Sequence, residues 1–164
     1  MRRSLLSFVL CCAAPAVLVS ALSATTAEAR GKKPEDALKG RIVLSTAPFP
    51  SGFKDDAAFI AYMKKVDTKG FRFEDKEKIS VELMAFFAAP VVQTQLTATL
   101  YDSTEGLEMK DTFPIYPGTR GTRILASYFD LRKAALESER RYKLVITDGF
   151  RGRVLAETDF AIKQ

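Results

Sequence analysis

The pattern of hydrophobic and polar positions predicts a strand and then a helix in the first part of the chain. Residues 41–46 are rich in β-branched side chains and end before Pro48, which is typical of a short strand. In residues 55–66 the apolar side chains recur every three or four positions, and Asp55 stands where a helix N-cap is expected. We therefore predict one helix of about three turns, ending near Gly70.

Beyond this helix the hydrophobic period changes to two, which is typical of strands. The predicted strands cover residues 79–87, 95–101, 112–115, 122–131, 142–147 and 154–163. Residues 112–115 are interrupted by Pro114 and predict an edge strand, whereas residues 122–131 are apolar on both faces and predict a strand inside the assembly. About seven short strands with one helix inserted after the first predict a mainly β fold, an antiparallel β-sandwich over residues 40–164.

The N-terminus has the pattern of an export signal. Arg2 and Arg3 precede an uncharged stretch, residues 5–24, and Ala27-Glu28-Ala29 has the small-x-small form of a signal peptidase site. We expect cleavage after Ala29, a periplasmic or secreted protein, and no transmembrane span afterwards. An uncleaved anchor and twin-arginine export remain alternatives.

The segment that follows the predicted cleavage site has a different composition. Residues 30–39 are charged, contain Gly and Pro, and lack apolar periodicity. This composition predicts a flexible leader between the signal peptide and the sandwich domain.

Composition excludes several chemistries. The chain has no His and no Trp, and its two cysteines, Cys11 and Cys12, lie in the predicted signal peptide. The domain therefore lacks the residues for a Ser-His-Asp triad, a thiol nucleophile, or a zinc or copper site of ordinary ligands. We expect no enzyme and no cofactor. The net charge of +5 is spread among acids without a long basic run, and we expect no nucleic-acid partner.

Two groups of carboxylates are candidate sites. Asp148, Glu157 and Asp159 lie near the last hairpin, and a pair of carboxylates on one face is the arrangement of a glycosidase. Asp102, with Glu105 and Asp111, surrounds a turn and offers hard oxygen ligands for Ca²⁺. A solvated face and a plain polar turn account better for these groups, so we predict neither a catalytic nor a metal site. A small envelope enzyme that uses carboxylates or a Ser-Lys pair is the alternative.

A basic set in the predicted loops is the stronger candidate for binding. The predicted binding residues are Arg120, Arg123, Arg151 and Arg153, with the loop aromatics Tyr116 and Phe150. Further basic residues flank the predicted corner, namely Arg132, Lys133, Arg140 and Arg141. If the loops converge, these side chains bind anionic groups of lipid, glycan or protein by bidentate hydrogen bonds. Scattered solvating charge is the alternative.

One apolar surface needs a partner or a cover. Met84 and Phe86 lie on the face of a strand that is expected to be polar, and an apolar run continues to Val92. We predict that the helix of residues 55–66 covers this face through Phe59, Ile60 and Met63, because the helix otherwise has nothing to pack against.

The segment from Leu131 to Lys163 resembles the end of an immunoglobulin-like sandwich. A helical corner leads into Tyr142-Lys143-Leu144 and a final hairpin, as in domains that carry a tyrosine corner. The resemblance implies that the Tyr142 hydroxyl bonds to main chain a few residues upstream. The chain differs from antibody domains in lacking the cysteine pair and the core Trp, and in its inserted helix.

Taken together, these patterns predict an exported, immunoglobulin-like binding or accessory module of the cell envelope that acts by recognition. The expected partner is another envelope or extracellular protein, or an anionic glycan or lipid, reached through end loops or an exposed edge strand. A basic-patch polyanion binder is a further alternative.

Overall fold

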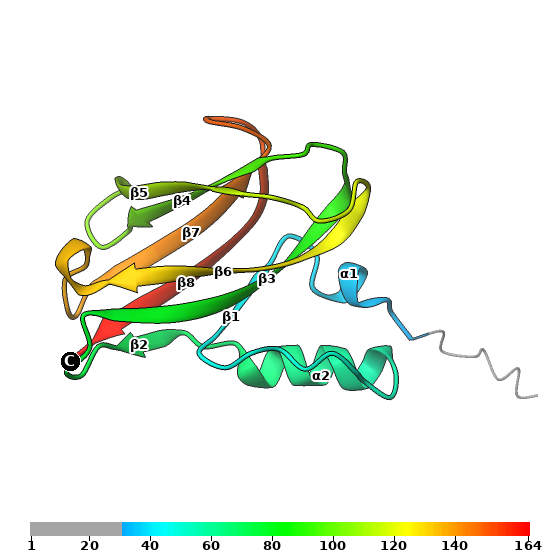
Figure 1. Cartoon of the computed structure of the whole chain (residues 1–164), viewed down its shortest axis with the longest axis horizontal. Coiled ribbons are helices and arrows are strands. Elements are labelled where there is room, and N and C mark those ends of the chain that lie inside the picture. The colour runs from blue at the N-terminus through cyan, green and yellow to red at the C-terminus, as the bar shows by residue number, and fades with distance from the viewer. Residues whose placement is uncertain (1–30) are drawn as a thin grey trace, which may run out of the picture.

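The computed structural model describes residues 31–164, which form two β-sheets and two short helices. In chain order the elements are α1 (Pro34–Ala37), β1 (Ile42–Ser45), α2 (Asp56–Val66), β2 (Gly70–Arg72), β3 (Lys78–Val91), β4 (Leu96–Asp102), β5 (Glu108–Ile115), β6 (Thr122–Arg132), the 3-10 turn η1 (Lys133–Ala135), β7 (Arg141–Thr147) and β8 (Val154–Lys163). One sheet has the order β1-β3-β6, and the other has the order β2-β8-β7-β4-β5. The mainly β prediction is confirmed, and Figure 1 shows the two sheets facing each other.

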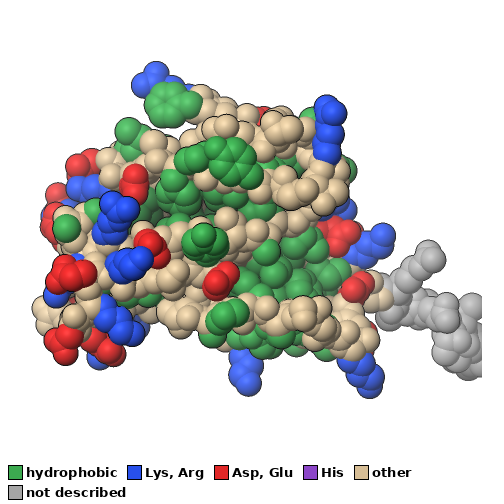
Figure 2. Space-filling view, viewed as in Figure 1, with side chains coloured by type: hydrophobic (Ala, Val, Ile, Leu, Met, Phe, Trp, Pro, Cys, Tyr) green, Lys and Arg blue, Asp and Glu red, His purple; other side chains and the backbone are tan. Residues whose placement is uncertain are grey.

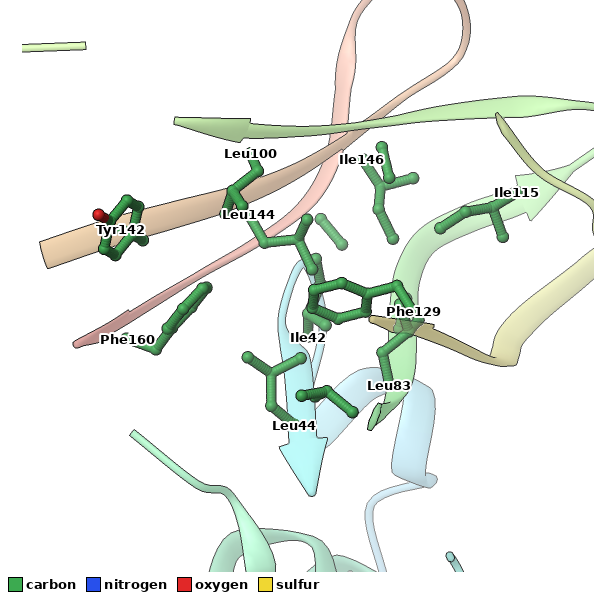
Figure 3. Close-up of a cluster of buried hydrophobic side chains, with 14 of the residues drawn as sticks. Ile42, Leu44, Leu83, Leu100, Ile115, Phe129, Tyr142, Leu144, Ile146 and Phe160 are labelled. Carbon is green, nitrogen blue, oxygen red and sulfur yellow. The ribbon is translucent and has the colours of Figure 1, made fainter. Parts of the chain in front are cut away.

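The main core lies between the two sheets and is built from the inward side chains of both. Leu44 and Leu83 come from the small sheet, and Leu144 comes from the large one; each is fully buried. Figure 3 shows these side chains meeting between the sheets. At one flank the rings of Phe113 and Phe129 stack with centroids 5.4 Å apart, which closes the core between the edge strands β5 and β6.

A second apolar cluster explains the inserted helix. Asp55 caps α2 by accepting a hydrogen bond from Ala58 N at 2.7 Å, as the sequence predicts. Met63 of α2 is fully buried, and Phe59 packs edge-on against Phe86 of β3 with centroids 6.1 Å apart. The predicted covering of this face by the helix is therefore confirmed. Figure 2 shows a hydrophobic area at the surface beside α2, on the face that the view presents.

Two details of the predicted sheet are wrong. The sandwich is not wholly antiparallel, because the short strand β2 pairs with β8 in parallel. The strand predicted inside the assembly is β6, which lies at the edge of the small sheet and exposes Tyr128. Both faces of this strand are apolar because each packs against a different cluster. Phe129 and Leu131 enter the main core, and Ile124 packs against the second cluster. The predicted edge strand around Pro114 is confirmed as β5.

The segment predicted as a flexible leader contains structure in its second half. Residues 34–37 form the helical turn α1, and Leu38 is buried in the second cluster. Arg123 of β6 holds this turn through an ion pair with Asp36 at 2.7 Å. The predicted signal peptide, residues 1–29, lies outside the described residues. In residues 31–164 neither helix is long and apolar enough to cross a membrane.

Tyr142, at the start of β7, is bound as the sequence predicts. Its hydroxyl accepts a hydrogen bond from Glu137 N at 2.7 Å and donates one to Glu137 O at 3.3 Å. The side chain is fully buried, and its ring stacks on Phe160 with centroids 5.8 Å apart. Burial raises the pKa of this hydroxyl, which keeps it protonated and able to donate.

We expect Tyr142→Phe to lower the free energy of unfolding by about 1–3 kcal/mol, because it leaves the Glu137 amide without its partner at a buried corner. Urea unfolding measures the change. Tyr128→Phe is the matched control, since its hydroxyl belongs to a side chain that is 70% exposed, and it is expected to change little. Equal stability of the Tyr142→Phe and wild-type proteins would contradict the corner's stabilising role.

Candidate functional site

Three connections lie at the same end of the sandwich, which we call the loop end. They are the β3–β4 loop (residues 92–95), the β5–β6 loop (residues 116–121) and the β7–β8 loop (residues 148–153). The strand registers place them together, because the pairs next to the loops are Leu96 with Ile115, Thr97 with Thr147, and Val91 with Thr122. In Figure 1 the first two loops lie on the same side as α1, and the β7–β8 hairpin projects above the sheets.

The loop end exposes large apolar side chains from all three connections. The exposed fractions are 53% for Val92, 64% for Tyr116, 65% for Phe150 and 52% for Val154. Full burial of one such side chain stabilises a fold by about 1.5–3 kcal/mol. These four exposed side chains do not contribute that free energy to the fold. Clustered exposure of this kind is typical of an interaction surface.

Three of the four predicted arginines make no close ion pair within residues 31–164, whereas the fourth makes one. Arg120 and Arg151 make no ion pair within residues 31–164, and Arg153 makes only a long contact to Asp148, at 3.9 Å. Arg123 is committed to structure: it pairs with Asp36 and donates to Ala88 O at 3.3 Å. The structure therefore places Arg120 on the same loop as Tyr116, places Arg151 and Arg153 on the same loop as Phe150, and assigns Arg123 to holding α1.

The other basic residues of the predicted set do not converge with these. Arg132, Lys133, Arg140 and Arg141 lie at the opposite end of the sandwich, where β6 finishes and β7 begins. Arg140 pairs there with Asp102 at 3.2 Å and with Glu137 at 2.7 Å. The expectation that all the basic loops form one surface is wrong, because adjacent antiparallel strands send consecutive connections to opposite ends of the sheet.

The β7–β8 loop is a rigid support for the residues at its tip. Gly152 N donates to Gly149 O at 2.9 Å, which closes a turn with Phe150 and Arg151 at its centre. The Asp148 carboxylate accepts from Arg153 N at 2.7 Å and ties the two sides of the loop. A Cβ at Gly152 would meet the Asp148 carboxylate oxygen, so a larger residue there would displace the carboxylate from Arg153 N. The Arg151 guanidinium lies 5.4 Å from the centroid of the Phe150 ring, a cation–π distance.

Arg151 has a backbone conformation that arginine adopts at a cost. Its φ is +60°, in the left-handed region, where an L-residue is less stable than glycine by about 1–2 kcal/mol. Glycine has a larger unfolded-state entropy, which offsets part of this difference. An arginine at this position is therefore better explained by what its side chain does than by the stability of the turn.

We expect Arg151→Gly to raise the free energy of unfolding by about 0.5–1 kcal/mol, because it relieves the positive φ. Chemical denaturation of the two proteins measures the difference. Arg153→Gly, two residues along and without a positive φ, is the matched control and is expected to lose stability by a similar amount. A loss of stability in Arg151→Gly would contradict the strain at this position.

Of the three carboxylates considered for catalysis, two lie together and the third lies apart. Glu157 and Asp159 share the outer face of β8, as their spacing predicts, and both pair with Lys143, at 3.4 and 3.7 Å. They border a wide hollow of about 770 Å³ whose wall also includes Arg41 and Lys69. Asp148 lies at the loop end, bound by backbone, and joins neither of them. The two carboxylates thus form an ion-paired group on the outer sheet face.

In the turn considered for Ca²⁺, the Asp102 carboxylate is bound by other residues of the protein. Asp102 is buried, accepts from Thr104 N at 2.9 Å and pairs with Arg140. Asp111 lies along β5 and accepts from Thr112 N instead of facing the turn. Within residues 31–164 no group of three acidic side chains is placed to hold a metal ion.

The exposure of two residues at the loop end was not predicted from the sequence. Val92 was assigned to an apolar run, and the period-two pattern placed Val154 inward with Ala156. In the β7–β8 pair, Ile146 lies opposite Ala156 and Thr147 lies opposite Val154, so Leu155 is an extra residue in a bulge. This bulge turns Val154 outward. The sequence signal that could have predicted this bulge is the glycine-rich hairpin, next to which the alternation of inward and outward side chains can change.

Comparisons with known proteins leave the function open. No protein-family model matches the chain, and a search of curated proteins finds no match. Among solved structures, β-glucosidase from Listeria innocua is similar in its complex with glucose (12% identity, TM-score 0.34, 59% of this chain) and in its complex with isofagomine (12% identity, TM-score 0.35, 76% of this chain). This chain spans about 15–16% of the length of that enzyme. A likeness at this level carries no inference about activity.

Proposed function

We propose that this protein is an exported, immunoglobulin-like binding module of the cell envelope that recognises its partner through the loop end and performs no catalysis. The observation that carries the proposal is the loop end itself, where two neighbouring connections expose Tyr116 and Phe150 and also carry Arg120, Arg151 and Arg153. Aromatic and arginine side chains are the groups that dominate binding energy at protein surfaces.

The strand order supports the immunoglobulin-like part of the proposal. In that fold, strands A, B and E are adjacent in one sheet and strands G, F and C in the other. The orders β1-β3-β6 and β8-β7-β4 correspond to these two sets in sequence and in space. Tyr142 begins the strand that corresponds to F, and its bond to Glu137 has the form of a tyrosine corner. The loops next to β4 and β7 at the loop end then correspond to B–C and F–G, which bind antigen in antibody variable domains.

The N-terminal sequence supports export. Two arginines, an uncharged stretch and Ala27-Glu28-Ala29 have the order of a cleavable signal peptide. Residues 31–164 contain no cysteine, so an oxidising compartment leaves the chemistry of this domain unchanged.

Recognition is favoured over catalysis by what each group of residues does. The carboxylates Glu157 and Asp159 are exposed and share one ion-pair partner, Lys143, whereas the two carboxylates of a glycosidase flank a reacting bond. The loop end instead has the features of a paratope: rigid aromatic side chains on short loops, with arginine beside them.

The test is binding to the envelope fraction of the producing cell. The full chain, expressed with its own leader and tagged after Gln164 at the opposite end, is incubated with envelopes from a strain that lacks it. We expect Phe150→Ser with Arg151→Ser to weaken binding at least about tenfold, the usual effect of losing a binding hot spot. Leu107→Ser is the matched control, because Leu107 is 67% exposed but lies in the turn at the opposite end.

Thermal unfolding of each variant confirms that the domain remains folded. The proposal is contradicted if the loop-end variant binds envelopes as well as the wild type, or if Leu107→Ser is equally impaired.

A further inference from the structure

The exposed side chains of the loop end are those suited to a boundary between water and lipid. Tyr116 and Phe150 are amphipathic or apolar rings on projecting loops, and Val92 and Val154 extend the apolar area. Aromatic rings of this kind concentrate at the headgroup level of membranes, where one end of the side chain is in water. The long stem of an arginine lies along apolar surface while its charged head reaches the phosphates.

The charge of the three loops is complementary to an anionic surface. Residues 92–95, 116–121 and 148–153 contain three arginines and a single acid, a net charge of +2. That acid, Asp148, is already bound to Arg153 N. The connections at the opposite end, residues 73–77, 103–107 and 133–140, contain six acids and three bases, a net charge of −3. Figure 2 shows charged side chains of both signs crowding the end where β6 finishes.

The N-terminal end of the described chain lies on the same side and carries charges of both signs. Arg123 at the start of β6 holds α1 through Asp36. Residues 31–38 contain Lys32 and Lys33 together with Glu35 and Asp36, so they add no net charge. The charge difference between the two sets of connections therefore orients the domain, with its loop end toward negative charge.

We infer that the loop end docks on the headgroup layer of an anionic phospholipid bilayer, with Phe150 inserted and Arg120, Arg151 and Arg153 bound to lipid phosphates. This inference rests on the proposed function and names its partner class. Apolar tips on projecting loops fit a deformable surface better than a preformed ligand cavity, and the hollow between the β3–β4 and β7–β8 segments has only about 150 Å³.

The absence of tryptophan from the whole chain makes insertion directly measurable. Phe150→Trp places a single fluorophore at the loop tip, and Leu107→Trp places one with similar exposure at the opposite end. The probes are vesicles of phosphatidylglycerol with phosphatidylethanolamine, and vesicles of phosphatidylcholine alone. We expect a blue shift of the emission for Phe150→Trp with the anionic vesicles only, and none for Leu107→Trp.

Co-sedimentation with the same vesicles tests the arginines. Replacing Arg120, Arg151 and Arg153 together by alanine is expected to weaken binding by at least about tenfold, since each basic residue at an anionic surface contributes roughly fivefold. Replacing Arg132, Lys133 and Arg141 by alanine removes the same charge from the opposite end and is expected to change binding little.

Four outcomes would overturn the inference while leaving the proposed function standing. They are loop-dependent binding to envelopes without a blue shift on anionic vesicles, equal binding to phosphatidylcholine, retention on heparin without vesicle binding, and loss of envelope binding after protease treatment, which would identify a protein partner. If envelope binding does not depend on the loop end at all, the proposed function fails as well.

Discussion

Phe86→Ala is expected to lower the free energy of unfolding by about 3–5 kcal/mol and to loosen α2 before the rest of the domain. Phe86 is fully buried between the small sheet and the helix, and Phe59 meets it edge-on. Phe53 packs on Phe59 with centroids 4.9 Å apart. Removing the Phe86 ring therefore opens a cavity under Phe59, which in turn supports Phe53. Because α2 has few other buried side chains, its attachment depends on this contact.

Hydrogen exchange combined with urea unfolding tests this expectation. In Phe86→Ala the amides of α2 should exchange faster than those of β7, whereas in wild type the two elements differ less. Phe87→Ala is the matched control, because the adjacent ring points into the main core and its loss should weaken the whole sandwich together. A loss below about 1 kcal/mol for Phe86→Ala, or unchanged relative exchange of α2, would disprove the dependence of the helix on this side chain.

Asp102→Asn is expected to lower the free energy of unfolding near neutral pH by about 1.5–3 kcal/mol, because the amide oxygen still accepts from Thr104 N but the charge-assisted bond from Arg140 is lost. Asp102 is 3% exposed and accepts from Thr104 N, and its partner Arg140 is held 3.2 Å away. Burial raises the pKa of this carboxyl, but the hydrogen bonds from Thr104 and the charge of Arg140 outweigh burial and hold the pKa below its usual value.

This direction determines how the effect depends on pH. Since the folded pKa lies below the unfolded pKa, the carboxylate stabilises the fold at pH values above the unfolded pKa, and the contribution disappears as pH falls through the folded pKa. The difference between Asp102→Asn and wild type should therefore be largest near neutral pH and shrink in acid. Unfolding by urea at several pH values measures it.

Asp159→Asn is the matched control for the pH series. Its carboxylate is exposed and pairs with Lys143 at 3.7 Å, and exposed pairs contribute at most about 1 kcal/mol. A difference between Asp102→Asn and wild type that stayed constant into acid would show that the charge of Asp102 is not what stabilises this turn.

The loop end connects stability with the proposed activity. Arg151 retains a positive φ, and Phe150 remains exposed although the fold has apolar clusters that accept such rings. Binding surfaces are where local structure departs from the most stable choice. If Arg151→Gly is more stable and binds less, both properties have one explanation.

Local sequence was sufficient to predict α2 and most of the strands. The alternation in residues 79–87 predicted β3 because successive side chains of a strand must face opposite sides. The spacing of Phe59 and Met63 after Asp55 predicted α2 because cap and apolar stripe are both local properties of a helix. Tyr142 was assigned to a corner whose partner lies only five residues upstream, and its bond is present.

Contacts between distant segments were beyond the sequence pattern. The strand β2 has three residues and exists because Gly70–Arg72 lies beside the end of β8, more than ninety residues later. The position of β6 at an edge was hidden because two separate apolar clusters both draw side chains from it. Arg123 could not be separated from the other arginines, since its partner Asp36 belongs to a segment without apolar periodicity.

The sequence alone determined the β architecture, the helix with its cap, the corner at Tyr142 and the exclusion of histidine and thiol chemistry, because each depends on residue type or on neighbours within a few positions. Only the tertiary structure decided which loops share an end, that the loops carrying Arg120, Arg151 and Arg153 are among them, and that Val154 is exposed there. The reason is physical: strand register and sheet order arise from packing across the whole core, and they bring together residues that no local period relates.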